Sequence, residues 1–220
     1  MQDLVNKLYE AISASKGVST NPLSVSYSPG AEHIWSKHNL WTMSGWKENE
    51  VQLNRNHIID DVERLQLELA NDIINGKNTT ARPTYLETTD NIITNIGLTE
   101  SAKRDTGEVS TTLTHNSIGT DSTTPTVSDT DLNTEDTGGS YARLAYASAG
   151  QRKVSNQTAK YGMLWQDSNV SAVPISIKES GVHWHVSDSS KMHARVTFTT
   201  FSMTAGDLFV TQINELHQNG

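Results

Sequence analysis

The feature that most constrains the fold of this chain is a change in hydrophobic pattern near Pro83. Before it, residues 48–75 carry apolar residues at the three- and four-residue spacing of an amphipathic helix. After it, short runs of alternating apolar and polar residues are separated by Gly, Asp and Asn, which is typical of strands and turns. The clearest strands are predicted at 141–148, 173–186, 192–203 and 207–216. We therefore expect a mainly β protein, with an antiparallel β-sandwich over residues 89–220 and a helical and extended region over 1–88.

The N-terminal region is interpreted as an attachment and oligomerisation region. Residues 3–14 predict a short amphipathic helix, and 18–30, rich in Pro and Ser, predict a loop or extended arm. The next segment holds Trp35, Trp41 and Trp46, and tryptophan is enriched at the centres of protein interfaces. These three residues either bind a partner or cover the protein's own core. In the same way, helix 48–75 packs either on its own domain or on other copies of the chain.

Composition excludes several classes of protein. The chain has no cysteine, which rules out a disulfide scaffold, a thiolate zinc site and a cysteine nucleophile. No apolar run is long enough to span a membrane, and the first residues lack the pattern of a secretory signal. A net charge of −8 and a pI near 5.4 argue against nucleic acid as a partner. The expectation is a protein that contacts neither nucleic acid nor membrane.

Histidines give the sharpest local pattern that could hold a metal. His183 and His185 alternate along a predicted strand and would point to one face, and His193 falls on the following strand. Such a face could bind zinc, or iron where copies of the chain meet on a symmetry axis. The alternative is a polar strand face beside a buried Trp184. Acidic residues between Asp121 and Asp136 lack the register of a calcium loop, so turn capping is expected of them.

No catalytic motif is present. The chain has no G-x-S-x-G, no H-E-x-x-H and no phosphate-binding loop. A glycosidase with two carboxylates stays open, since sequence spacing cannot exclude one. We expect no enzyme and no cofactor.

From about Asn91 to its end, the chain resembles a family of bacteriophage and archaeal-virus tail- or fibre-associated virion structural proteins. Four stretches carry the resemblance: NIITNIGLTESAKRD; the IGT-to-acid segment, with Ile118-Gly119-Thr120, Pro125, Asp129-Thr130, Leu132 and Glu135; the I-x-E-x-G pattern, with Ile177, Glu179 and Gly181; and the closing strands, with Arg195, Phe198, Gly206 and Asp207. The first stretch corresponds to a turn that leads into a short helix. The chain departs from the pattern at Asp121, where a glycine is usual, and at Val182-His183, where Leu-Phe is usual.

The resemblance implies a virion structural protein located in the virion, of tail, baseplate or fibre type, in a symmetric homo-oligomer such as a trimer. Its expected partners are other copies, other virion proteins and a host-surface glycan. The alternatives are a capsid decoration or turret protein and, from another class, a carbohydrate-binding β-sandwich module. Gly119, Glu179 and Gly181 are expected to be structural. Glu179 in particular is expected to accept backbone N–H bonds from the IGT segment and so anchor a neighbouring loop.

Overall fold

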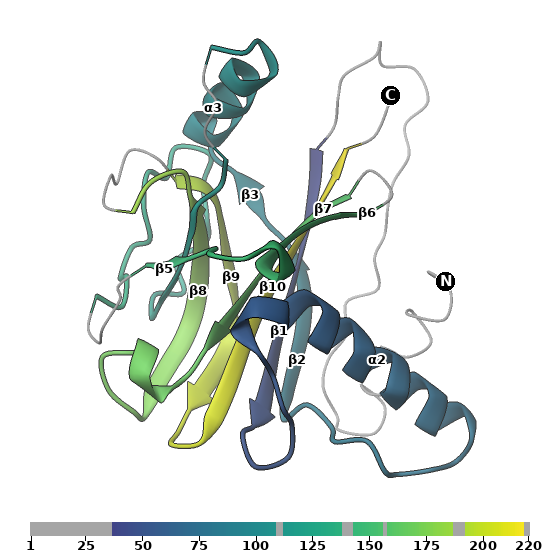
Figure 1. Cartoon of the computed structure of the whole chain (residues 1–220). Helices are drawn as coiled ribbons and strands as arrows, with labels where there is room; N and C mark the ends of the chain where they lie inside the picture. The colour runs from purple at the N-terminus through teal and green to yellow at the C-terminus, as the bar shows by residue number, and fades with distance from the viewer. Residues whose placement is uncertain (1–36, 109–111, 138–142, 156–157, 187–191, 218–220) are drawn as a thin grey trace.

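In the computed structural model, described for residues 37–108, 112–137, 143–155, 158–186 and 192–217, two antiparallel sheets pack face to face (Figure 1). The first sheet has the order β2 (Tyr85–Asp90), β1 (Lys37–Lys47), β10 (Asp207–His217), β7 (Thr158–Trp165) and β6 (Arg152–Ser155). The second has the order β3 (Ile92–Ile93), β9 (Met192–Met203), β8 (Ile175–His183), β4 (His115–Gly119) and β5 (Leu144–Ala145). The predicted antiparallel β-sandwich is confirmed.

The main core lies between the two sheets, where alternate residues of both meet. It includes Trp41, Met43, Ile118, Trp165, Ile177, Val182, Val196 and Phe209. One polar side chain joins the sheets inside this core. Asn116 on β4 accepts hydrogen bonds from Trp165 Nε1 at 3.2 Å and from Thr211 Oγ1 at 2.9 Å, and it donates to Gly181 O at 3.0 Å. Its polar atoms therefore have partners, as burial requires.

A smaller core lies between the outer face of the first sheet and helix α2 (Ile58–Ile74), which follows the 3₁₀ turn η1 (Arg55–His57). The apolar stripe of α2 packs on the sheet residues Trp46, Leu164, Leu208 and Val210. The predicted helix over 48–75 thus begins later, because the Asn54 side chain accepts from Asn56 N and starts the turn there. The helix ends at Ile74, and Gly76, whose φ is 64°, turns the chain just beyond it. The apolar stripe of the helix packs on its own domain, which is the first of the two alternatives given for residues 48–75.

The predicted boundary between residues 88 and 89 is also wrong, because it falls inside β2. Strand β1 pairs with β10 over its whole length, from Lys37 opposite His217 to Lys47 opposite Asp207, and β2 pairs with β1 on the other side. The described residues before position 89 are therefore part of the sandwich. The strand pattern was hidden because β1 is covered on both faces: Trp41 and Met43 face the inter-sheet core, while Trp46 lies under α2.

Helix α3 (Asn95–Asp105) leaves the second sheet at one end of the sandwich (Figure 1). Thr94 accepts from Gly97 N at 2.9 Å as the N-cap, and it donates to Met192 O at 2.6 Å, which fixes the helix to β9. The expected turn leading into a short helix is therefore present at this point. Within the described ranges, no helix is long and apolar enough to span a membrane.

Candidate functional site

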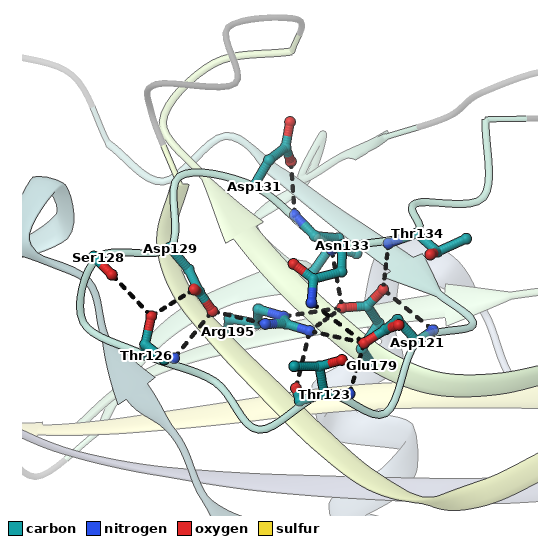
Figure 2. Close-up of polar contacts among 11 residues, drawn as sticks. Asp121, Thr123, Thr126, Ser128, Asp129, Asp131, Asn133, Thr134, Glu179 and Arg195 are labelled. Carbon is teal, nitrogen blue, oxygen red and sulfur yellow. Dashed lines mark hydrogen bonds and ion pairs between the residues drawn. The ribbon is translucent and has the colours of Figure 1, made fainter.

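The segment 120–136 crosses the outer face of the second sheet and is held there by polar contacts (Figure 2). Ile177 and Val182 on β8, and Ala194 and Val196 on β9, face the core. Strand alternation then turns Arg195 to the other face of the sheet. The side chains that meet the segment therefore come from the centre of the sheet.

The first contact between the sheet and the segment is the Glu179–Arg195 anchor, a buried ion pair that also reaches Asp129. Glu179 is 0% exposed and Arg195 is 1% exposed. Arg195 Nε and Nη2 lie 2.9 and 2.8 Å from Glu179 Oε2, and Nη1 lies 2.7 Å from Asp129 Oδ2. Arg195 Nη2 also donates to Thr123 O at 3.1 Å. The guanidinium thus joins two strands of the sheet to the segment above them.

Glu179 also accepts hydrogen bonds from the backbone of the segment. The donors are Thr134 N at 3.0 Å, Asp121 N at 3.4 Å and Asn133 N at 3.4 Å. Asp121 directly follows the Ile-Gly-Thr triplet, so the expectation that this carboxylate anchors a neighbouring loop through backbone N–H groups is confirmed.

Two glycines allow the segment to approach the sheet closely. A Cβ on Gly119 would lie 2.5 Å from both Glu179 Oε1 and Thr134 O. A Cβ on Gly181 would lie 3.0 Å from Leu132 Cδ2 and 3.1 Å from His183 Nε2. Gly119 is therefore required by the anchor itself, and Gly181 leaves room for Leu132 to pack on the sheet.

The second contact is the Arg143 anchor, formed by Arg143 with Asp131 and Glu135. Arg143 Nη2 lies 2.7 and 2.8 Å from the two Asp131 oxygens and 2.9 Å from Glu135 Oε2, while Nε lies 2.9 Å from Glu135 Oε1. Nη1 donates to His185 O at 3.4 Å. Burial raises the pKa of Glu135 above its usual value, although Arg143 opposes that effect. The sequence offered no signal for this role, since Arg143 lies in a stretch read only as a strand.

Asp121 and Asp129 cap turns, as predicted for the acids of the segment, whereas Asp131 and Glu135 bind Arg143 instead. Asp121 accepts from Thr123 N at 2.6 Å, and hydrogen bonds from Thr123 lower the pKa of this carboxyl. Asp129 accepts from Thr126 N at 3.0 Å. Burial raises the pKa of Asp129, but hydrogen bonds from Thr126 and Arg195 outweigh it and lower the pKa overall.

The three histidines predicted as metal ligands do not come together. His183 is buried with Nε2 2.6 Å from Ser117 Oγ, whereas His193 lies 3.3 Å from Glu215 Oε2 and edge-on to Trp184. His185 lies beyond the end of β8, which stops at His183 after a register shift against β9, so the alternation that would align the two side chains ends there. Among the described residues, no three His, Asp or Glu side chains are grouped to hold a metal ion.

The tryptophans also differ from the prediction. Trp41 is 0% exposed and Trp46 is 1% exposed, so both are part of the protein's own core and cannot bind a partner. Trp35 lies outside the described residues.

Comparisons of the chain with protein-family models, with curated proteins and with solved structures gave no match.

Proposed function

We propose that this chain is a structural protein of a virus particle, a tail, baseplate or fibre-type component that acts as a symmetric homo-oligomer. One observation carries the proposal. The residues on which the resemblance depends, among them Gly119, Asp129, Glu179 and Arg195, meet in a single buried network that holds a segment on a sheet. The residues that this chain shares with the family pattern thus support the fold and do not face a substrate. We therefore infer a shared structural module and not a shared catalytic site.

The chemistry of this network also favours a structural role. A catalytic acid, base or nucleophile must reach a substrate. Glu179 and Arg195 are buried and paired with each other, and Arg143 is paired with two carboxylates. The hollow on the surface is no better suited to catalysis. It lies at the end of β1 that is marked by Lys47, and it is lined by Tyr85, Phe201 and several hydroxyl side chains. Its two ionisable groups of opposite charge, Lys47 and Asp207, lie 2.5 Å apart and neutralise each other.

Attachment to the particle is proposed for residues 1–36. The sequence alone assigned it to a longer region, but β1 is a strand of the sandwich and its tryptophans are buried. Trp35 is the tryptophan of that cluster left to act as an anchor.

Contacts between copies must use a surface other than the buried stripe of α2. On the outward side of α2, Leu67 and Ile74 are 67% and 66% exposed.

The test is the location of the chain. Immunogold electron microscopy, with an antibody against the recombinant protein, should label purified particles of the virus that encodes it at one fixed position. A chain found only in the cell fraction would overturn the proposal. If that chain also bound a glycan array, the carbohydrate-binding alternative would replace it.

The attachment step has its own experiment. A variant lacking residues 1–36 should melt at the temperature of the full chain yet be missing from particles. Trp35→Ala should weaken incorporation by about 2 kcal/mol or more, as expected of an interface anchor, and Trp35→Phe is the matched control that should retain most of it. Normal incorporation of the shortened chain would place the attachment surface on the sandwich.

A further inference from the structure

Helix α2 is followed directly by an asparagine–glycine pair, Asn75-Gly76, and both residues are exposed. Among the residues that the structure describes, Asn75 is the only asparagine that precedes a glycine. Glycine has no Cβ, so the backbone can turn freely there and the peptide nitrogen of Gly76 can reach the side chain of Asn75. The pair therefore places a potential nucleophile next to the carbonyl carbon of a side-chain amide.

Hydrogen bonds hold the pair in an unreactive conformation while the helix is formed. Asn75 Nδ2 donates to Asn71 O at 2.7 Å and to Asn71 Oδ1 at 2.9 Å, so the amide points back along α2. Gly76 N donates to Ile73 O at 3.3 Å. With ψ of Asn75 at 5°, Gly76 N lies beside the backbone nitrogen of Asn75 and away from its side chain. A reaction within the pair therefore requires the end of the helix to open.

Asp72 holds the turn that follows the pair. Its carbonyl oxygen accepts from Lys77 N at 2.8 Å, and its Oδ2 accepts from Thr79 N at 2.9 Å and from Thr80 N at 2.7 Å. The last turn of α2 has no basic side chain to stabilise it, and helix ends open at a low cost in free energy. Asp72 is therefore the residue that controls how often the pair is released.

We propose that Asn75-Gly76 is a site of spontaneous deamidation, gated by the opening of the C-terminal end of α2. In the open form, Gly76 N loses its proton to hydroxide and attacks Asn75 Cγ. The Cγ–Nδ2 bond breaks, and ammonia leaves with a proton taken from water. The resulting cyclic imide takes up one water molecule and opens to aspartate or, where water attacks the main-chain carbonyl, to isoaspartate. Water is the only co-reactant, and the inference does not depend on the proposed function.

The product is expected to weaken the end of α2. The new carboxylate lies at the C-terminus of the helix, where the macrodipole disfavours a negative charge. It also cannot donate to Asn71, as the amide does. An isoaspartate adds one atom to the main chain, so Lys77 N no longer matches Asp72 O. The modification should therefore loosen the connection between α2 and β2.

Peptide mapping by mass spectrometry tests the site on the full chain, kept in mildly alkaline water labelled with oxygen-18. Each deamidated position takes up the label, and mapping separates position 75 from Asn219, which also precedes a glycine. Asn75 should be labelled well before Asn78, which is also exposed but precedes a threonine. Asn75→Gln is the matched variant, because it keeps the amide but must close a larger ring, and it should take up no label at position 75. Equal labelling of Asn75 and Asn78 would overturn the proposal.

Asp72→Asn tests the gate, because it weakens the hold on the turn without touching Asn75. Labelling of Asn75 should be about tenfold faster in this variant, the factor that follows from the loss of a hydrogen bond to a charged group. Glu68→Gln removes the same charge one turn earlier on the exposed side of α2, and it should react at the wild-type rate. A wild-type rate in Asp72→Asn would refute the gate.

A synthetic peptide spanning residues 71–81 gives the rate of the open form, since so short a segment does not form a stable helix in water. It should deamidate faster than the full chain. Equal rates in the peptide and in the full chain would likewise refute the gate, whatever the behaviour of the variants.

Discussion

Replacing Glu179 by Gln tests the network that holds the segment 120–136 on the second sheet. The substitution conserves shape but removes the negative charge that Arg195 and three backbone N–H groups share. The Gln side chain keeps one oxygen as an acceptor. Its NH₂ group would face Arg195 or the backbone N–H groups, which are themselves donors, so these groups would lose an acceptor. The variant therefore leaves a buried guanidinium with only part of its countercharge.

The size of the effect can be estimated from the contacts. Removal of one partner from a buried ion pair costs about 3–5 kcal/mol. Asp129 stays 2.7 Å from Arg195 and offsets part of the loss, so the lower end of the range applies, about 3 kcal/mol. For a chain of this length, that loss corresponds to a melting temperature lower by about 6–12 °C.

Urea unfolding followed by tryptophan fluorescence would measure this loss. Glu68→Gln is the matched control, because Glu68 pairs with Arg64 on the exposed side of α2 and should change stability by under about 0.5 kcal/mol. If Glu179→Gln lost less than about 1 kcal/mol, the buried pair would not have the role assigned to it here.

Three further predictions concern other parts of the fold. Gly119→Ala should lower the free energy of unfolding by about 1–3 kcal/mol, measured in urea, because its Cβ would meet atoms of the anchor that cannot move apart. Trp46→Ala should cost about 3–5 kcal/mol in the same assay, whereas a tryptophan that only bound a partner would leave the stability unchanged. Hydrogen bonds from Thr80 and Thr79 lower the pKa of Asp72 to about 2, so its contribution to stability is present above pH 4 and declines as the pH falls from about 4 to 2; Asp72→Asn should remove that part of the pH dependence of the melting temperature.

Much of the fold was accessible from the sequence. The last two strands were predicted almost to their bounds, since Val196 and Phe198 alternate with polar residues in β9 and face the core. β1 was missed because the first sheet is covered on its outer face by α2, which removes the alternation of a half-exposed strand. β7 was missed for the same reason: Met163 faces one core and Leu164 the other.

At the site, the part carried by a recognisable pattern was predicted and the part that depends on long-range pairing was not. Glu179 was assigned as an anchor because it falls in a pattern with Gly181. Its partner Arg195 and the second anchor at Arg143 could not be assigned, because sequence does not show which acids lie opposite a given arginine. The predicted grouping of His183, His185 and His193 failed for a related reason, since a register shift at the end of β8 changes which residues share a face.

The pairing of β1 with β10 also determines when the protein can fold. The first strand of the described chain pairs with the nearby β2 on one side, but its partner on the other side is the last strand, β10, which joins β1 to β7. During synthesis the five-stranded first sheet therefore cannot be completed until Asp207–His217 has left the ribosome, and until then β1 and β2 stay separated from β7 and β6. Strand pairs so far apart in sequence form slowly and expose aggregation-prone edges in the meantime. A chain cut short before β10 would lack the centre of the first sheet, so we expect such a product to be degraded or to aggregate, whatever the state of the segment on the second sheet.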